Sequence, residues 1–161
     1  NDVILKQIIE EYDFDICPVI DKAIVELMFT TMKTNNGIGL AAQQIGQNLR
    51  GFVMNINDEE FVCVNPLIIE QSEEMIISKE GCLSFPNLTL SVKRPAGISV
   101  SYKNETGIMQ NRLFDGVYAR CFCHELDHLN GITFDTKIAK TSLQLAKQKR
   151  TMFLKQQKRR K

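Results

Sequence analysis

The stretch CFCHELDHLNG, residues 121–131, contains His124 and His128, which are the only two histidines of the 161-residue chain. In an α-helix, residues four apart lie about 40° from each other around the axis, so both imidazoles project from one face and can bind one ion. Glu125, about 100° further round, comes near that ion without having to bind it. The stretch therefore predicts a helix that carries two metal ligands and a general base in the pattern H-E-x-x-H.

A third ligand is needed, because a catalytic metal ion such as Zn²⁺ usually takes three protein ligands and keeps one position for water. The chain has no third histidine, and no acidic residue follows Asp135. The ligand therefore lies upstream or is a nearby cysteine. Cys121 lies three residues before His124 on a similar helix face, whereas Cys82 lies in SKEGCLSFP after a predicted strand. Spacing leaves both open, with a preference for Cys82 because a loop can present its thiolate without strain.

The rest of the chain predicts an α+β fold. Apolar residues recur at helical spacing from Pro18 to residue 35, and Asp115 and Gly131 mark the ends of the helix that carries the histidines. A basic C-terminal helix is expected over about 138–158. Segments rich in Val, Ile and Phe predict strands at 51–56, 61–66, 67–71, 74–79 and 97–104. Because strands and helices do not alternate regularly, an α+β arrangement in a single domain over 1–161 is favoured over β-α-β units.

The composition is typical of an intracellular protein. The chain has no run of roughly 18 apolar residues and no signal-peptide pattern. Its five cysteines are an odd number, which argues against a disulfide framework and for reduced thiols. We expect a soluble, cytoplasmic protein without a membrane partner, and an organellar origin is equally compatible with the sequence.

Charge is distributed unevenly along the chain. From Lys137 to Lys161 there are ten Lys or Arg and no Asp or Glu, which leaves residues 1–136 with a formal net charge of about −9. A basic segment of this kind suits a phosphate-rich partner, because binding releases counterions. A solvated terminal helix or a loose end is the alternative interpretation.

Three segments together resemble the ordered motifs of peptide deformylase: GIGLAAQQIG at 37–46, EGCLS at 80–84 and HELDHLNG at 124–131. VKRP at 92–95 and DGVYAR at 115–120 extend the resemblance. It implies a deformylase-like fold, in which mixed or antiparallel strands pack around a central helix that carries HELDH. It also implies metal-dependent hydrolysis that removes the formyl group from the N-terminal formylmethionine of new polypeptides and releases formate.

The resemblance assigns the metal site position by position. The family's metal ligands match Cys82, His124 and His128, which decides the third ligand in favour of the cysteine in EGCLS. A thiolate with two imidazoles suits several divalent ions, and the family is known chiefly as an Fe²⁺ enzyme, with Zn²⁺ in many isolated forms. One divalent ion is therefore expected, Fe²⁺ ahead of Zn²⁺, Ni²⁺ or Co²⁺. Such an ion activates water by lowering its pKa toward about 7.

The resemblance also assigns the groups around the reacting amide. Glu125 matches the catalytic acid and base, which takes a proton from water and delivers it to the leaving amine. The Gln44 side-chain amide and the backbone N–H of Leu83 match the donors to the oxyanion. The residues matched to the peptide cleft and to the methionine pocket are Ile38, Gly39, Val117, Arg120 through its stem, Cys121 and His124.

Three features depart from the family. Cys123 stands where Gln is common, and Thr89 stands where some members carry an Arg that faces the peptide. The usual early P-D-P-x-L-R stretch is not recognisable in residues 1–18. None of these departures replaces a ligand, the base or an oxyanion donor.

Two other functions share some of these features. A metal-stabilised module whose basic helix binds RNA would have the same ligands and tail, but a structural site is closed by a fourth protein ligand and needs no base. A metallopeptidase would share H-E-x-x-H, but it would have a later ligand and no EGCLS. In a deformylase, the basic tail favours docking to the ribosome, where formylated chains emerge.

Overall fold

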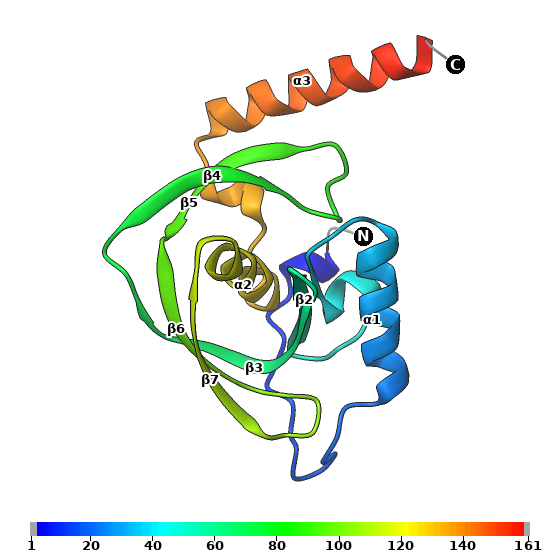
Figure 1. The fold of residues 1–161 in the computed structure, drawn as a ribbon. Coiled ribbons are helices and arrows are strands. Elements are labelled where there is room, and N and C mark those ends of the chain that lie inside the picture. Colours follow the sequence, from blue (N-terminus) through cyan, green and yellow to red (C-terminus); the bar gives the residue numbers. More distant parts are fainter. Residues whose placement is uncertain (1–2, 160–161) are drawn as a thin grey trace.

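The computed structural model describes residues 3–159, which form strands, helices and short 3₁₀ turns (Figure 1). The strands are β1 (Gly39–Ala41), β2 (Gly51–Ile56), β3 (Glu59–Gln71), β4 (Met75–Gly81), β5 (Thr89–Pro95), β6 (Gly97–Lys103) and β7 (Met109–Asp115). The helices are α1 (Lys22–Thr34), α2 (Gly116–Leu129) and α3 (Lys140–Arg159), with short 3₁₀ turns η1 (Ile4–Lys6), η2 (Ala42–Ile45) and η3 (Phe134–Lys137).

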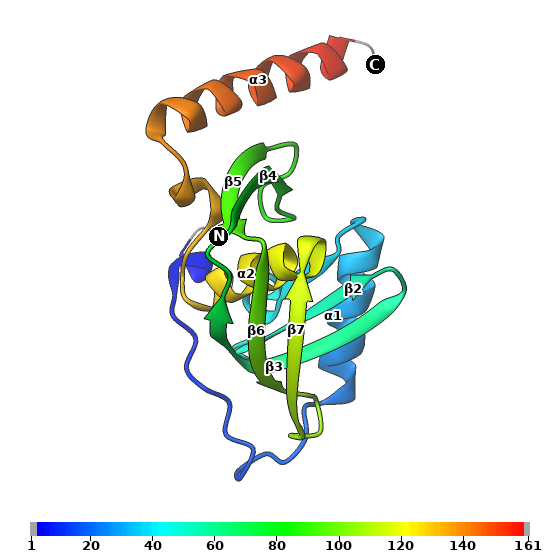
Figure 2. The same cartoon turned by 60° about the vertical axis from the view of Figure 1, so that its left-hand side comes forward.

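Two antiparallel sheets surround α2, the helix that carries both histidines (Figures 1 and 2). The larger sheet has the strand order β1-β2-β3-β6-β7, and β4 pairs with β5 in a separate ribbon. All these pairings are antiparallel. The predicted α+β class and the central position of the HELDH helix are therefore confirmed.

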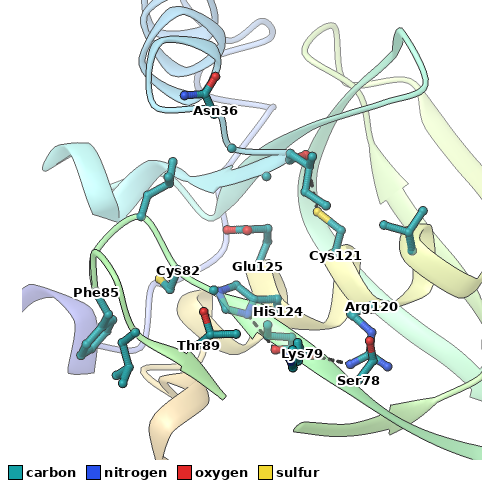
Figure 3. Close-up of a pocket in the computed structure, with 18 of the residues that line it drawn as sticks. Asn36, Ser78, Lys79, Cys82, Phe85, Thr89, Arg120, Cys121, His124 and Glu125 are labelled. Carbon is teal, nitrogen blue, oxygen red and sulfur yellow. Dashed lines mark hydrogen bonds and ion pairs between the residues drawn. The ribbon is translucent and has the colours of Figure 1, made fainter. Parts of the chain in front are cut away.

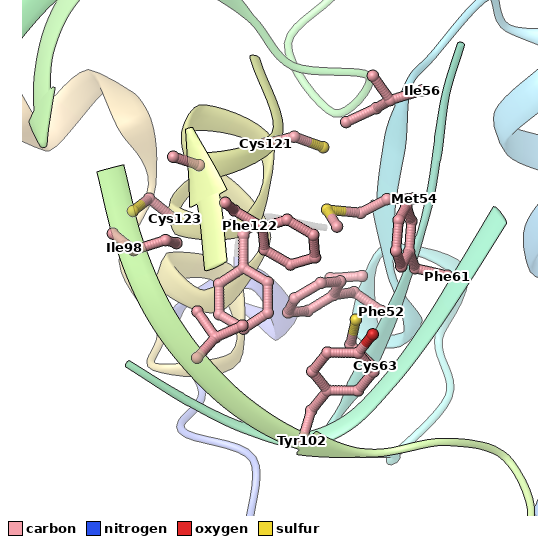
Figure 4. Packing of buried hydrophobic residues seen from close by; sticks show 14 of the residues in the cluster. Phe52, Met54, Ile56, Phe61, Cys63, Ile98, Tyr102, Cys121, Phe122 and Cys123 are labelled. Atoms are coloured by element: carbon pink, nitrogen blue, oxygen red, sulfur yellow. The ribbon is translucent and has the colours of Figure 1, made fainter. Parts of the chain in front are cut away.

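The core lies between α2 and the large sheet, and aromatic rings fill it. Phe122 of α2 meets Phe52 of β2 edge to face, with ring centroids 5.1 Å apart. Phe61, Tyr102 and Phe114 complete the same cluster (Figure 4). Because α2 is buried on most sides, its histidines are held in one place relative to the sheet.

Strand β2 is covered on both faces, which explains its continuous apolar sequence. Phe52 and Met54 belong to the cluster around α2, whereas Val53 packs with Met28 and Met32 of α1. A strand buried on both faces needs apolar residues at successive positions rather than at alternate ones. The strand predicted at 51–56 is present as β2, and its burial on both faces explains the apolar run from which it was predicted.

The first helix begins at Lys22, so the predicted start at Pro18 is wrong. The carboxylate of Asp21 accepts a hydrogen bond from the N–H of Ala23 at 2.9 Å. A cap of this kind satisfies an N–H group that otherwise has no partner in the first helical turn. The proline therefore lies in the connection that precedes the helix.

The two strands predicted at 61–66 and 67–71 are one strand, β3. Pro66 lacks an N–H group and interrupts the hydrogen-bond ladder, and the register with β6 shifts between Val64 and Leu67. Asn65 has a φ of 49°, as a bulge at this point requires. Three further strands were not predicted: β1 is very short, β5 carries a charged residue in its apolar alternation, and β7 is mostly exposed.

Gly131 lets the N-terminal segment pass close to the end of α2. Its φ is +71°, and a Cβ atom there would lie 2.6 Å from the carbonyl oxygen of Lys6. We expect Gly131→Ala to lower the free energy of unfolding by about 2 kcal/mol or more, because the new methyl group must push backbone aside as well as accept the strained φ. Urea denaturation measures this. Gly46→Ala is the matched control, since its φ is +80° with open space around it, and an equal loss in both variants would contradict the role of close packing.

Helix α3 extends away from the rest of the protein beyond the β4-β5 ribbon (Figures 1 and 2). Leu143 and Ala146 near its base pack against the cluster that contains Leu90 and Phe134, and no α3 residue is fully buried. The basic helix predicted over about 138–158 is therefore present with slightly shifted ends. Within residues 3–159, no helix combines the length and the apolar character needed to cross a membrane.

Candidate metal centre

A loop and a helix bring Cys82, His124 and His128 together. Each residue offers one ligand atom, and these atoms lie within 4.8 Å of one another. Cys82 directly follows β4, and its Sγ lies 3.3 Å from Nε2 of His128. The two imidazoles project from the same face of α2, with ring centroids 5.1 Å apart. One sulfur and two nitrogens at these separations fit a single divalent ion such as Zn²⁺ or Fe²⁺.

The two imidazoles lie in different electrostatic surroundings. Burial, together with the charges of the neighbouring His124 and Arg94, lowers the pKa of His128 to about 3. Burial by itself also lowers the pKa of His124, but hydrogen bonds to Cys82 and Glu80 outweigh it and raise the pKa to about 10. The surroundings of His124 thus favour positive charge, whereas those of His128 favour a neutral imidazole, which is the form that binds a metal.

Glu80 sets the orientation of His124. One of its oxygens, Oε2, lies 3.0 Å from Nδ1 of His124, and the other accepts hydrogen bonds from Arg94 and Arg120, each at 2.9 Å. Burial alone would raise the pKa of Glu80, but the hydrogen bonds from His124 and Arg94 outweigh it and lower the pKa to about 2. An ionised Glu80 accepts a hydrogen bond from Nδ1–H of His124. A metal that replaces the Nε2 proton can then bind Nε2 while this hydrogen bond stays in place.

Sequence reasoning assigned no role to Glu80 or Arg94, although both lie in segments that carried the resemblance. Glu80 opens EGCLS, and Arg94 lies within VKRP. The available signal was the alternation of Leu90, Val92 and Arg94 along β5, which places all three side chains on the buried face. A charged residue at a buried position of a strand indicates a buried ionic partner.

Glu125 lies in the cavity with one oxygen free. It is buried, and its Oε2 has no hydrogen-bond partner in the described part of the chain. Burial raises its pKa to about 7, although the charge of His124 and a hydrogen bond from the Ala41 backbone act in the opposite direction. Gly39 makes room for this carboxylate, because a Cβ atom on Gly39 would lie 2.5 Å from Oε1. The free oxygen is thus available to a proton donor in the cavity.

Gln44 reaches the loop that carries Cys82. Its Nε2 donates to Oγ of Ser84 at 3.0 Å and contacts Sγ of Cys82 at 3.7 Å. Its Oε1 accepts from the N–H of Ala41 at 2.8 Å, which fixes the direction of the amide. Leu83 lies between Cys82 and Ser84 on the same loop and lines the same cavity as Gln44. The two predicted oxyanion donors therefore lie beside the third predicted ligand.

One cavity of about 810 Å³ contains nearly all the predicted site residues (Figure 3). The predicted residues among its lining are Ile38, Gly39, Gln44, Cys82, Leu83, Val117, Arg120, Cys121, His124 and Glu125. His128 lies behind this surface and is 1% exposed. Cys82, His124 and Glu125 lie close together in the cavity, with Phe85 on one side of them and Cys121 and Arg120 on the other (Figure 3). The structure therefore brings together residues that are far apart in the sequence.

The wall of the cavity is partly apolar and open to solvent. Ile38 is 47% exposed and Val117 is 44% exposed. The guanidinium group of Arg120 binds Glu80 and the carbonyl oxygens of Ile76 and Val92, so this charge is already neutralised. The stem of Arg120 stays available to contact a ligand, and its role in the methionine pocket stays a prediction.

The three departures from the family lie in different places. Thr89 lines the cavity, so a neutral hydroxyl occupies a position where some members carry a charge. Cys123 is buried among core residues near Ile98 (Figure 4) and does not line the cavity, and burial raises its pKa to about 11. The N-terminal segment is joined to α2 by a hydrogen bond from the N–H of Ile9 to the carbonyl of Leu129 at 2.9 Å.

Comparison with known proteins identifies the family to which the chain is similar. The family described as "Polypeptide deformylase" matches residues 1–144. A peptide deformylase of Finegoldia magna is 46% identical over 123 residues, which cover 75% of this chain and 76% of the relative. A second, from Synechocystis, is 42% identical over 122 residues, which cover 73% of this chain and 65% of that relative.

Solved structures give the same answer. A peptide deformylase of Synechococcus elongatus, crystallised with actinonin, superposes with a TM-score of 0.82 at 35% identity and covers 92% of this chain and 81% of its own. The motifs, the fold and these relatives agree, and the chain belongs to the polypeptide deformylase family.

Proposed function

We propose that this chain hydrolyses the formyl amide of N-formylmethionyl peptides with the help of one divalent metal ion, Fe²⁺ ahead of Zn²⁺, Ni²⁺ or Co²⁺. The observation that carries this proposal is the convergence of three ligand atoms with the free oxygen of Glu125 in a cavity whose wall is partly apolar. Such substrates occur where formylated chains are made, in a bacterial cytoplasm or in an organelle.

The proposed reaction assigns one task to each group. A divalent ion held by Cys82, His124 and His128 would lower the pKa of water and polarise a carbonyl oxygen. Glu125 takes a proton from the attacking water and returns it to the amine as the C–N bond breaks, which gives formate and a free N-terminus. The amide of Gln44 and the N–H of Leu83 donate hydrogen bonds to the formyl oxygen as it gains charge.

The peptide is proposed to bind along β1. This strand lies at one edge of the large sheet and pairs only with β2 among the described residues. Apart from the Ala41 N–H, which donates to Gln44, its other edge is open to an extended peptide. Ile38 and Gly39 lie at that edge and line the cavity. The methionine side chain would contact Ile38, Val117, Cys121 and the stem of Arg120.

The direct test uses formyl-Met-Ala-Ser with anaerobically prepared Fe²⁺-loaded protein. Free amine should be released from this peptide and not from acetyl-Met-Ala-Ser, and removing the metal with a chelator should abolish the release. Elemental analysis of protein purified without oxygen identifies the metal. Absence of amine release from the formylated peptide would reject the proposed reaction.

We further propose that α3 docks on the ribosome. No α3 residue is fully buried, and the helix carries cations without a single acidic residue, while residues 1–136 have a formal net charge of about −9. Deleting residues 140–161 should weaken co-sedimentation with ribosomes at low salt, because it removes the cations of α3. Unchanged co-sedimentation after the deletion would rule out this role.

A further inference from the structure

Lys137, the last residue of η3, is connected to the predicted metal ligand His124 by a continuous series of ion pairs. Its Nζ lies 2.9 Å from Oδ1 of Asp127, and Oδ2 of Asp127 accepts a hydrogen bond from Nη1 of Arg94. Arg94 binds both oxygens of Glu80, at 2.9 and 3.0 Å. Glu80 in turn lies 3.0 Å from Nδ1 of His124. The series begins three residues before α3 and ends at the metal centre.

Most of these ion pairs are buried, so water and salt screen them less than they screen a surface ion pair. The side chains of Arg94 and Glu80 are 3% and 4% exposed, that of Asp127 is 13% exposed, and only Lys137 is substantially open to solvent at 33%. Arg94 is shared between the carboxylates of Glu80 and Asp127, and Lys137 supplies a second positive charge to Asp127. Without Lys137, Asp127 has Arg94 as its one cation. Arg94 is then attracted more strongly to Asp127, and its ion pair with Glu80 weakens.

The same short segment also touches His124 directly. The ring of Phe134, the first residue of η3, lies 5.6 Å from the His124 ring, and Phe134 is 1% exposed. One end of η3 therefore packs on the imidazole while the other end connects to it through charges. Movement of η3 changes both contacts together.

We propose that Lys137 is a positioning residue for His124, acting through Asp127, Arg94 and Glu80, and that η3 thereby links the base of α3 to the metal centre. This inference rests on the proposed metal-dependent function. It predicts that the chain's own tail segment helps to set the geometry and lifetime of the bound ion.

The test compares Co²⁺-loaded proteins by their visible absorption and by the rate at which they lose Co²⁺ to a chelator. Lys137→Met should change the d–d bands, which report coordination geometry, and should speed Co²⁺ loss roughly threefold to tenfold. Lys137→Arg should restore both, because it keeps the charge. The matched control is Lys140→Met, which removes a nearby charge that takes part in no salt bridge within residues 3–159, and it should behave as the parent.

A second variant tests the route of the effect. Asp127→Asn removes the charge that Lys137 and Arg94 share, and it should speed Co²⁺ loss at least as much as Lys137→Met does. The double variant should lose Co²⁺ at a rate within about twofold of Asp127→Asn, because both substitutions act through one series. Three results would overturn the inference: a Lys137→Met protein with the parent's spectrum and rate, an equal effect from Lys140→Met, or a full Lys137→Met effect in the Asp127→Asn background. No formylated substrate is used, so failure here is distinguishable from failure of the proposed function.

Discussion

Glu125→Gln is expected to lower kcat for formyl-Met-Ala-Ser about 10²- to 10⁴-fold, because the amide cannot take a proton from water. Glu125 is buried beside the predicted ligands, and its Oε2 has no hydrogen-bond partner in the described part of the chain. The substitution keeps the size of the side chain, so the metal content should not change. Steady-state kinetics and elemental analysis of the same preparation measure the two quantities.

The control for this variant is Glu26→Gln, which alters an exposed carboxylate on α1 and should leave both quantities unchanged. An unchanged rate in Glu125→Gln would remove Glu125 from the role of base. Loss of the metal together with the activity would instead make Glu125 a ligand, in conflict with the assignment of Cys82, His124 and His128.

Arg94→Met is expected to lower the free energy of unfolding by about 3–5 kcal/mol, since it leaves two buried carboxylates without their shared cation. Arg94 is 2% exposed and is bound to both Glu80 and Asp127. Urea denaturation of the metal-free protein measures the loss. The substitution should also change the orientation of His124, because Glu80 loses one of the two arginines that hold it in place and keeps only Arg120.

The matched control is Lys33→Met, which breaks the pair between Lys33 and Glu60, whose side chains are 55% and 46% exposed. An exposed pair of this kind contributes about 0–1 kcal/mol, so the loss should be small. Similar losses in the two variants would contradict the view that the buried ion pairs at the metal centre also stabilise the fold.

The central helix could be predicted from sequence because its signals are local. Asp115 and Gly131 mark its ends, and the spacing of His124 and His128 places both rings on one face. The third ligand could not be fixed in this way. Cys82 reaches the histidines only because β4 runs past α2, and no local rule connects residue 82 with residue 124, so its assignment required the family resemblance.

The buried ion pairs were not predicted. The alternation of Leu90, Val92 and Arg94 is a local sign of a buried charge, but it does not identify the partners of that charge. Glu80, Arg94 and Asp127 come from two strands and a helix, and each finds its partner only in the folded chain. The start of α1 and the continuity of β3 were missed for a different reason. Proline is common at the first position of a helix and rare inside a strand, which misplaced both predictions. The helix instead begins after the cap at Asp21, and a bulge at Asn65 lets β3 continue through Pro66.

The family, the α+β fold and the enzyme class predicted from the three motifs are confirmed by the matching family and its solved structures. The domain assignment over 1–161 and the roles of individual site residues stay predictions. The geometry supports those roles through the ligand atoms within 4.8 Å of one another and the cavity that they share with Glu125 and Gln44.

The most direct measurement is mass spectrometry of every product formed from formyl-Met-Ala-Ser carrying a ¹³C-labelled formyl group. Labelled formate and intact Met-Ala-Ser should accumulate in equal amounts, because only the formyl amide is broken. Free Ala-Ser would show cleavage of an internal bond by a metallopeptidase. An unchanged peptide in the presence of the bound metal would indicate a binding module without catalysis, and either result would contradict the proposed deformylation.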